Sequence, residues 1–461
     1  MNLLLWFRND LRSHDNPALQ YVLAQHKLDT PVEAIFFVTH KQWLQHDWSA
    51  RKIDFIMRHA NALVAELANV NIMLKLVEVD SFAEQISYLV SYCQNNQVSE
   101  IVANSEVELN ETLRDNALQA AGVKLTLFEA DVIVPKGKLL TQSGEMFKVF
   151  TPFKQAWLSY VKALGFDYLG KLTHKQLEAC QHSETETSLT SAWPLAKDYE
   201  RDVLPQFLAE KLAQYAQKRD FPAIKGTAGI SPYLAAGVIS PRYLLRLLLT
   251  KYPDLLSSPN AEAFSWLNEL IWREFYRHQL FHHPKLCKHE SFKSQYQGLP
   301  WLNDAHAFKA WQQGKTGYPL VDAAMRQLNS TGWMHNRLRM VVASFLTKHL
   351  LIDWRWGEQY FMQQLIDGDF AANNGGWQWA ASTGCDAQPY FRIFNPIRQS
   401  ERFDPNGEFI RTYIPELANI PDKEIHFPHD YIAKHGLRQY WPPIVEHKSA
   451  RLRALAFFKA N

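Results

Sequence analysis

The stretch from residue 333 to residue 379 contains W-M-H-N-R-L-R-M (333–340), D-W-R-W (353–356) and I-D-G-D-F-A-A-N-N-G-G-W-Q-W (366–379). Trp, Asn, Gly and paired Asp are crowded here beside Arg, whereas a plain hydrophobic core is built from Leu, Ile and Val. Indole rings can stack on a bound ring, and amide groups can pair with hydrogen-bonding edges. The stretch therefore predicts a binding site on a helical framework. The alternative is a buried polar network that only fixes helix packing.

The length and composition indicate a globular protein with more than one domain. The chain has 461 residues, which exceeds what one hydrophobic core usually holds. Its first residues, M-N-L-L-L-W-F, meet Arg8 and Asp10 at once, unlike a secretion signal, and no apolar run is long enough to span a bilayer. The four cysteines have neither paired nor metal-ligand spacing. We expect a cytoplasmic protein with no membrane segment and no bound metal.

Charge is distributed unevenly along the chain. Residues 1–190 carry 17 Lys and Arg against 22 Asp and Glu, whereas residues 191–461 carry 32 against 25. The second part also holds 11 of the 15 Trp. A basic, aromatic-rich part joined to an acidic part predicts that only the second part meets nucleic acid.

The first 130 residues alternate between short apolar runs and helix-period sequence, as in a doubly wound parallel sheet covered by helices. There is no glycine before Gly122, so the sheet lacks the loop that a Rossmann or Walker phosphate site requires. The clearest predicted helix has apolar residues spaced by three and four between Ile53 and Leu67. The predicted strands are Leu3–Phe7, Ala34–Val38, Ile72–Leu76, Ile101–Ala103 and Leu125–Leu127.

Beyond the sheet the pattern changes twice. From residue 131 to 195 it loosens, and Gln181–Ser191 is polar enough to predict an exposed connection. After residue 195 the sequence is mainly helical. We therefore predict an α/β domain at 1–130, a connection at 131–195 and a larger all-helical domain at 196–461.

Several long motifs in order along the chain carry a resemblance to the photolyase/cryptochrome flavoprotein family. The nearest branch resembles the bacterial class I enzymes that repair cyclobutane pyrimidine dimers. The resemblance implies an N-terminal α/β antenna domain and a larger helical FAD-binding domain, which agrees with the pattern above. The motifs lie at Trp6–Asn16, Val149–Lys154, Trp266–His278, Lys315–Leu328 and Pro443–Lys448.

The resemblance implies a reduced, non-covalent FAD. The turn K-G-T-A-G-I-S (225–231) opens a helix and matches the family's phosphate segment, which usually reads T-S-x-L-S, so Ala228 replaces a serine hydroxyl. Asn373 matches the residue that faces flavin N5, where an amide suits a reduced flavin. Asp367 and Arg339 match an ion pair beside the flavin ring. The full set is Tyr215, Thr227, Ala228, Gly229, Ile230, Ser231, Trp266, Glu269, Arg273, Trp333, Asn336, Arg339, Asp367, Asp369 and Asn373.

The substrate residues implied by the resemblance lie on two predicted helices. Helical spacing places Trp266, Glu269, Trp272 or Arg273, and Tyr276 on one face, and Trp333, Asn336 and Met340 on one side of a second helix. By resemblance, Glu269 and Asn336 bond the thymine edges, and Trp272, Trp379 and Met340 form the pocket walls. Arg219 and Arg337 lie near the damaged strand, with Arg392 as a further candidate.

The type of damage follows from two positions. The (6-4) branch carries histidines where this chain has Asn336 and Met340, and His335 would be turned about 100° away on the helix. The cyclobutane dimer is therefore the better prediction. The branch that prefers single-stranded DNA lacks the two pocket tryptophans, so the presence of Trp272 and Trp379 favours duplex DNA.

Two further groups of residues rest on the resemblance. Trp301, Trp354 and Trp377 match the chain that carries an electron from the surface to oxidised flavin, although their spacing alone would indicate only a core. A second set matches positions that hold a folate antenna, 5,10-methenyltetrahydrofolate. The alternatives are a polar domain interface, or a deazaflavin or no antenna. The antenna set is His46, Asn110, Glu111, Cys287 and Lys288.

The expected function is light-driven repair of UV-damaged DNA by a monomer, associated with the nucleoid through its DNA. The first alternative is a blue-light signalling cryptochrome without repair activity. The second is a structural, helical DNA-binding protein, which would not need Asn373 or the Asp pair at 367 and 369.

Overall fold

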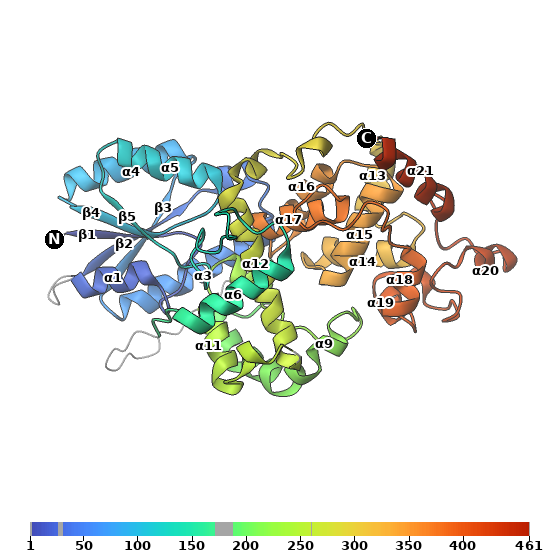
Figure 1. Cartoon of the computed structure of the whole chain (residues 1–461), viewed down its shortest axis with the longest axis horizontal. Coiled ribbons are helices and arrows are strands. Elements are labelled where there is room, and N and C mark those ends of the chain that lie inside the picture. The colour runs from blue at the N-terminus through green and yellow to red at the C-terminus, as the bar shows by residue number, and fades with distance from the viewer. Residues whose placement is uncertain (1, 26–30, 171–187, 260, 461) are drawn as a thin grey trace. The chain divides into compact units, whose positions relative to one another are not determined.

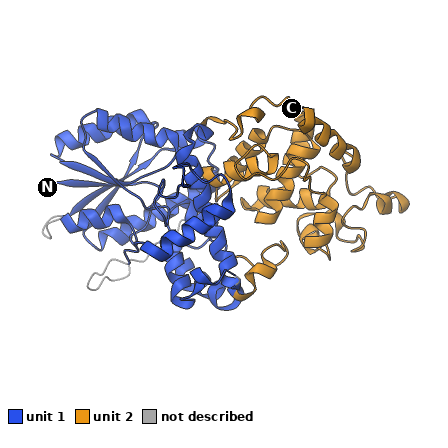
Figure 2. Ribbon diagram, viewed as in Figure 1, with its two compact units in different colours: residues 1–212, 228–287 blue, residues 213–227, 288–461 orange. Residues whose placement is uncertain are grey.

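The structure is a computed structural model that describes residues 2–25, 31–170, 188–259 and 261–460 (Figure 1). Its contacts divide the chain into two compact units, which Figure 2 colours separately. Unit 1 contains residues 1–212 and 228–287, and unit 2 contains residues 213–227 and 288–461. The domain limits expected near residues 130 and 195 stay a prediction.

Unit 1 begins with a parallel sheet of five strands in the order β3-β2-β1-β4-β5. In register, Leu5 lies opposite Ala34 on one side and Val102 on the other. Every residue of the central strand is buried, because helices cover both faces. All five predicted strands and the doubly wound fold are confirmed. The strands are β1 (Leu3–Phe7), β2 (Val32–Val38), β3 (Ile72–Glu78), β4 (Glu100–Asn104) and β5 (Leu125–Phe128).

The helices around the sheet lie in two layers, with α4 and α5 on one face and α1 and α3 on the other (Figure 1). The predicted helix at 53–67 lies within α3, where the Ser49 side chain caps the first turn by accepting from the Lys52 amide. The bounds are α1 (Pro17–Gln25), α2 (His40–Gln45), α3 (Ala50–Ala68), α4 (Phe82–Asn95) and α5 (Leu109–Ala120).

The charged residues of the motif at 6–16 are buried and paired. Arg8 forms two hydrogen bonds of 2.8 Å with Asp115 on α5. Arg12 donates to the carbonyl of Gly237 at 2.7 Å. Gly237 has a φ of +66°, and a Cβ there would lie 1.7 Å from the carbonyl oxygen of Asn9. Only glycine fits this close approach, so the motif fastens the carboxyl end of the central strand to the helical part of unit 1.

The segment after the sheet is fixed by a buried carboxylate. Glu274 is fully buried and accepts from the amides of Ile133 and Val134 and, at 2.6 Å, from Nε1 of Trp157. Burial raises the pKa of Glu274 to about 7, while these donors act in the opposite direction. The helices involved are α6 (Phe150–Leu164) and α12 (Glu262–His282), and α11 (Pro241–Lys251) with η4 (Leu255–Ser257) precedes them.

Where it is described, the polar connection is exposed at Leu189 and Ser191, as predicted, and differs from the prediction only at Thr190. Residues 181–187 lie outside the described residues, but Thr190 is buried rather than exposed. Its amide and hydroxyl donate to Asp54, and its carbonyl accepts from Arg58 at 2.7 Å, so partners on α3 offset its burial. Short helical turns follow: α7 (Ala196–Asp198), η1 (Tyr199–Val203), α8 (Leu204–Gln206), η2 (Phe207–Lys211), η3 (Leu212–Gln214), α9 (Tyr215–Lys218) and α10 (Ser231–Ala235).

Unit 2 is helical around a tryptophan-rich core. Asp322 is fully buried and holds residues 440 and 441 in place, because it accepts from Tyr440 at 2.6 Å and from Trp441 at 2.8 Å. Its elements from η5 onward are η5 (Pro284–Lys288, which begins in unit 1), η6 (Ser294–Tyr296), α13 (Ala305–Gln312), α14 (Pro319–Thr331), α15 (Asn336–Ser344), η7 (Phe345–His349), α16 (Trp354–Gln364), α17 (Phe370–Ala381), α18 (Pro396–Phe403), α19 (Glu408–Tyr413), η8 (Pro415–Leu417), α20 (His429–Lys434) and α21 (His447–Ala460).

Within the described ranges, no helix is both long and apolar enough to cross a bilayer.

Candidate active site

The start of α15 corrects two expectations about the 333–340 motif. Gly332 ends α14 with a φ of +71°, and α15 begins only at Asn336, so Trp333 lies in the link and not on the helix. His335 caps α15, since its Nδ1 accepts from the Arg337 amide at 3.2 Å. Its ring is buried at the helix start instead of projecting from a side face, and burial lowers its pKa to about 4. A histidine cap is uncommon, so the sequence pattern did not reveal it.

An ion pair joins α15 to the turn before α17. Arg339 Nη2 lies 2.7 Å and 3.0 Å from the two oxygens of Asp367, and its Nε donates to the Met334 carbonyl at 2.9 Å. Asp369 caps α17 by accepting from the Ala372 amide at 2.9 Å. The two aspartates of the I-D-G-D motif thus have different structural partners, and both lie where α17 begins.

Asn373 is oriented by a residue that sequence analysis missed. Its Nδ2 donates to the Glu358 carbonyl at 3.0 Å. The Glu358 side chain accepts from Asn374 at 2.8 Å, and Asn374 in turn accepts from Gln378 at 2.9 Å. Glu358 on α16 therefore fixes the amide side chains of α17. The sequence held one signal for it, since Glu358 is a carboxylate that lies between two of the quoted motifs.

The three tryptophans predicted to form an electron path all lie in unit 2 and differ in burial. Trp354 and Trp377 are buried, whereas Trp301 is half-buried and packs 5.3 Å from the ring of Phe457. Gly357 makes room for Trp377, because a Cβ there would lie 2.1 Å from the indole ring. Of the three, Trp301 is the most exposed.

In unit 1, the predicted stripe lies on the single helix α12. Trp272 is half-buried and stacks on Phe150, with ring centroids 3.6 Å apart and planes 6° apart. Arg273 donates to the carbonyl of Asp131, and Trp266 is buried 5.3 Å from Phe207. Trp266 and Arg273 therefore also support the fold, while Glu269 stays half-buried.

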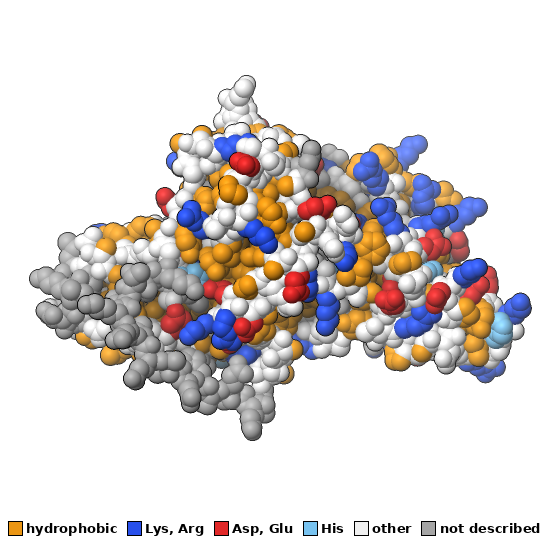
Figure 3. Space-filling model, turned by 90° about the horizontal axis from the view of Figure 1, so that it is seen from below, with side chains coloured by type: hydrophobic (Ala, Val, Ile, Leu, Met, Phe, Trp, Pro, Cys, Tyr) orange, Lys and Arg blue, Asp and Glu red, His pale blue; other side chains and the backbone are white. Residues whose placement is uncertain are grey.

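The arginines predicted near DNA have different surroundings. Arg337 pairs with Asp220 at 2.7 Å and lies 4.5 Å over the ring of Phe403. Arg219 lies 5.3 Å over the buried Tyr215 ring, and Arg392 is exposed. Figure 3 shows Lys and Arg side chains among exposed hydrophobic ones on one face of the molecule. In unit 2, Asn336 is exposed and Met340 and Trp379 are half-buried.

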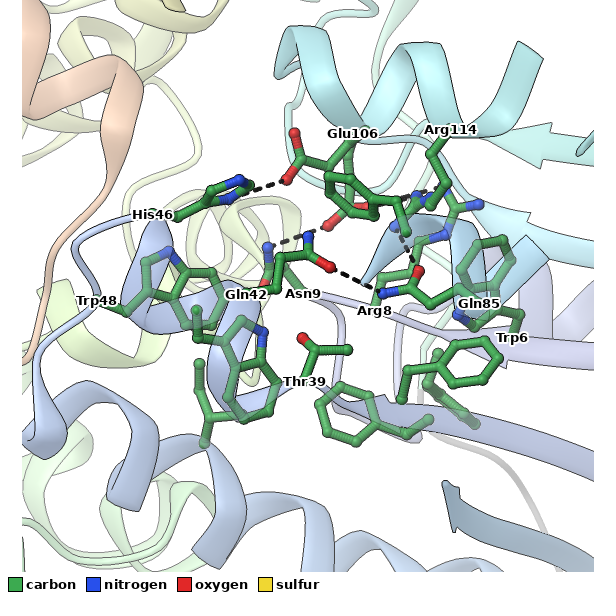
Figure 4. A pocket seen from close by; sticks show the side chains of 17 residues that line it. Trp6, Arg8, Asn9, Thr39, Gln42, His46, Trp48, Gln85, Glu106 and Arg114 are labelled. Atoms are coloured by element: carbon green, nitrogen blue, oxygen red, sulfur yellow. Dashed lines mark hydrogen bonds and ion pairs between the residues drawn. The ribbon is translucent and has the colours of Figure 1, made fainter. Parts of the chain in front are cut away.

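A pocket of about 50 Å³ lies in unit 1 at the carboxyl ends of β1 and β2, the usual place for a ligand in such sheets (Figure 4). His46 and Glu111 line it, with Nδ1 3.9 Å from Oε1, and Asn110 lies 3.5 Å from His46. Burial, with Glu108 and Glu106 nearby, raises the pKa of Glu111 to about 8. The structure thus brings three predicted antenna residues together, while Cys287 lies at the end of unit 1 and Lys288 at the start of a segment of unit 2.

A doubly wound sheet without a Rossmann glycine loop, followed by tryptophan-rich helices, defines a two-part α/β and helical architecture. Residues 3–172 match the domain family described as DNA photolyase, and residues 266–460 match the one described as the FAD binding domain of DNA photolyase. The chain is 46% identical to a protein of Escherichia coli named deoxyribodipyrimidine photo-lyase, over 99% of this chain and 98% of that protein. The chain belongs to the DNA photolyase family.

Solved structures share the fold. An archaeal photolyase from Sulfolobus tokodaii, described with two FAD molecules, is 28% identical with a TM-score of 0.80, and all of both chains is covered. A cryptochrome from Synechocystis is 25% identical with a TM-score of 0.82, and 99% of each chain is covered. Repair enzymes and a cryptochrome therefore have this architecture in common, and the fold alone does not separate the two functions.

Proposed function

We propose that this protein uses light to split cyclobutane pyrimidine dimers in DNA, as a carbon–carbon lyase with a non-covalent reduced FAD. The observation that carries this proposal is the 46% identity with deoxyribodipyrimidine photo-lyase along almost the entire chain. The chemistry of the candidate residues agrees with it, because aromatic rings, amides and a paired carboxylate are what a flavin and a pyrimidine pair require. No feature of the described residues favours the signalling alternative.

The residues of unit 2 fit a flavin ring. The backbone carbonyl of Glu358 accepts from Nδ2 of Asn373. The Oδ1 of Asn373 could then accept a hydrogen bond from the N–H at N5 of a reduced flavin. Arg339 holds Asp367 in one orientation beside the start of α17. When bound, reduced FAD supplies an electron on absorbing light and takes it back after the ring has split. Release of FAD from denatured protein, identified by chromatography, tests the assignment, and release of FMN or of no flavin rejects it.

The proposed substrate contacts divide into edge contacts and pocket walls. Glu269 and Asn336 form hydrogen bonds with the pyrimidine edges. Trp272, Trp379 and Met340 provide surfaces for a flipped-out dimer. The stacking of Phe150 on Trp272 supports this role, because a ring held in place loses little freedom when a base stacks on it. Trp272→Ala should therefore lower the preference for damaged over undamaged DNA.

The proposed electron path can be separated from repair by two variants. Trp301→Phe keeps an aromatic ring but removes an electron donor, so photoreduction of oxidised FAD should stop while chemically reduced protein still repairs DNA. Glu269→Ala should have the opposite effect, because it removes an edge contact and leaves the path intact. Loss of repair in chemically reduced Trp301→Phe would contradict the assignment of this residue to the path.

For the antenna, we propose 5,10-methenyltetrahydrofolate bound by His46, Asn110, Glu111, Cys287 and Lys288. The pocket beside His46 and Glu111 supports a ligand there, since its polar side chains can pair with a pterin. Acid extraction and mass spectrometry should release a folate besides FAD, and Glu111→Ala should remove the folate only. A deazaflavin, or FAD alone, would reject the folate.

The decisive experiment is repair of a thymine dimer in a duplex oligonucleotide by fully reduced protein. Restoration of intact thymines in light but not in darkness supports the proposal. FAD-loaded protein that repairs nothing in light would leave the signalling function as the better one. A single-stranded substrate and size-exclusion chromatography test the preference for duplex DNA and the proposed monomer.

A further inference from the structure

Tyr199, which the sequence analysis did not single out, contacts the turn proposed to bind the FAD phosphates. Its hydroxyl donates to the carbonyl of Ala228 at 2.8 Å. The Tyr199 side chain is almost fully buried, so this hydrogen bond is shielded from water. Next along the turn, Gly229 has a φ of +67°, a conformation that other residues rarely adopt.

The bond to Ala228 determines where the next amide points. In a planar trans peptide, the carbonyl of one residue and the N–H of the next point in opposite directions. Because the carbonyl of Ala228 is directed at the Tyr199 hydroxyl, the amide of Gly229 is directed away from it. The amides of Ala228, Gly229 and Ile230 donate to no described group of the protein. They are therefore available to an anionic ligand.

The position of Tyr199 is itself fixed from the sheet part of unit 1. Nε2 of His59 on α3 accepts from the Ala196 amide at 3.0 Å, at the start of the turns that carry Tyr199. Also on α3, Arg58 donates to the carbonyl of Trp193 at 2.9 Å. Tyr199 then lies in η1, a π-helical turn, a type often found at functional sites. The turn is thus held through a series of direct contacts that begins on α3.

We propose that Tyr199 is a positioning residue for FAD, which directs the backbone amides of the 228–230 turn toward the FAD phosphates. The inference rests on the proposed function, since it assumes FAD as the ligand. Ala228 makes the role of Tyr199 larger, because a turn with one hydroxyl fewer depends more on its backbone donors. The direction of backbone donors is set only by the conformation of the turn.

Tyr233 provides a matched control. Its hydroxyl donates to the carbonyl of Pro194 at 2.8 Å, and its ring centroid lies 4.2 Å from that of Tyr199. Tyr233→Phe therefore removes the same kind of hydrogen bond from the same buried cluster without releasing the carbonyl of Ala228. A purely structural role would affect both variants alike.

The test is FAD titration of flavin-free full-length protein, followed by flavin fluorescence, together with thermal unfolding of each flavin-free variant. We expect Tyr199→Phe to bind FAD roughly threefold to tenfold more weakly, while Tyr233→Phe binds as wild type and both unfold at similar temperatures. Equal affinity of Tyr199→Phe and wild type, or equal weakening in both variants, overturns the inference. Wild-type protein that binds no FAD rejects the proposed function instead.

Hydrogen exchange gives a second measure, and its first comparison uses wild-type protein alone. In wild-type protein, FAD should slow amide exchange at residues 228–230. At the same FAD concentration, this slowing should be smaller in Tyr199→Phe than in Tyr233→Phe. Unchanged exchange at these amides on adding FAD to wild type overturns the inference.

Discussion

The sheet part of unit 1 and the helical unit 2 both use arginine–aspartate pairs, but in different surroundings. The Arg8 and Asp115 side chains are 3% and 7% exposed, whereas those of Arg339 and Asp367 are 26% and 2% exposed, and those of Arg337 and Asp220 20% and 31%. Near the sheet, both charges are closed off from solvent, and Arg8 meets open space only where it lines the pocket beside His46 and Glu111. In unit 2, the arginines keep a surface that another molecule can contact. Exposure of the cation, more than the pairing itself, separates candidate site residues from structural ones.

The strongest test of the structural role of the sheet motif is Gly237→Ala. Its Cβ would meet the Asn9 carbonyl oxygen at 1.7 Å in a left-handed backbone conformation, so we expect a loss of more than about 3 kcal/mol in the free energy of unfolding. Circular dichroism during heating, with the soluble yield, measures this. Gly376→Ala on α17 is the control, because a Cβ there meets nothing within 4 Å and should not destabilise. Equal stability of the two variants would contradict the close-packed contact.

Asp115→Asn and Asp367→Asn compare the two kinds of ion pair directly. Asp115→Asn removes the nearer carboxylate from the buried Arg8 and Arg114, with only Glu106 left to both, and should cost about 3–5 kcal/mol of stability. Asp367→Asn should cost about 1 kcal/mol, because water can still reach Arg339, and its main effect should be loss of FAD on purification. Urea unfolding and flavin content measure the two effects. A larger stability loss for Asp367→Asn would reverse the distinction drawn above.

The pH dependence of unit 1 should come partly from His59. Its neutral ring donates from Nδ1 to the Phe55 carbonyl at 2.7 Å and accepts at Nε2 from Ala196, so a second proton would face an N–H group. Burial lowers its pKa from 6.5 to about 4. The unfolded chain therefore binds the proton first, and stability is lost as pH falls from 6.5 toward 4, by at most about 3 kcal/mol. Urea unfolding across this pH range should show that the free energy of unfolding falls less steeply in His59→Asn than in wild type.

Arg337→Ala should have the smallest effect on the stability of the fold and a measurable effect on DNA binding. Its half-exposed pair with Asp220 contributes about 1 kcal/mol or less. If Arg337 contacts a phosphate, binding to damaged and to undamaged DNA should weaken together. The slope of log affinity against log salt concentration should become shallower by about 1. Arg411→Ala is a control for the loss of one positive charge, since Arg411 also pairs with an aspartate, Asp422, and donates to the Ile420 carbonyl. A change in the preference for damage would show that Arg337 contacts the lesion instead.

The sequence predicted the parts of the molecule that depend on periodicity. The five strands and the helix around Ile56 follow from hydrophobic spacing, and the site stretch follows from unusual residue types. One prediction was wrong where a helix starts, and a second failed at a single residue of an otherwise exposed segment. Trp333 lies before α15 because His335 acts as the cap, and Thr190 is buried because Asp54 and Arg58 satisfy it.

Residues that act on the site from outside the motifs could not be predicted. Tyr199 and Ala228 are far apart in sequence, and no spacing rule connects a tyrosine to a distant carbonyl. Gly357 is similar, since its need for a missing side chain appears only once Trp377 packs on it. Such long-range contacts depend on the complete tertiary structure, which local patterns do not encode.

The division of the chain into units has a consequence for synthesis. The peptide leaves unit 1 at residue 212, contributes 213–227 to unit 2, and returns at 228. This excursion packs against residues made much later, since Phe221 contacts Phe403 and Asp220 pairs with Arg337. On the ribosome, where N-terminal parts emerge first, the sheet can form early while 213–227 waits for its partners. A fragment ending at residue 287 would therefore expose this segment, so the protein is not divisible into two independently folding pieces at that point.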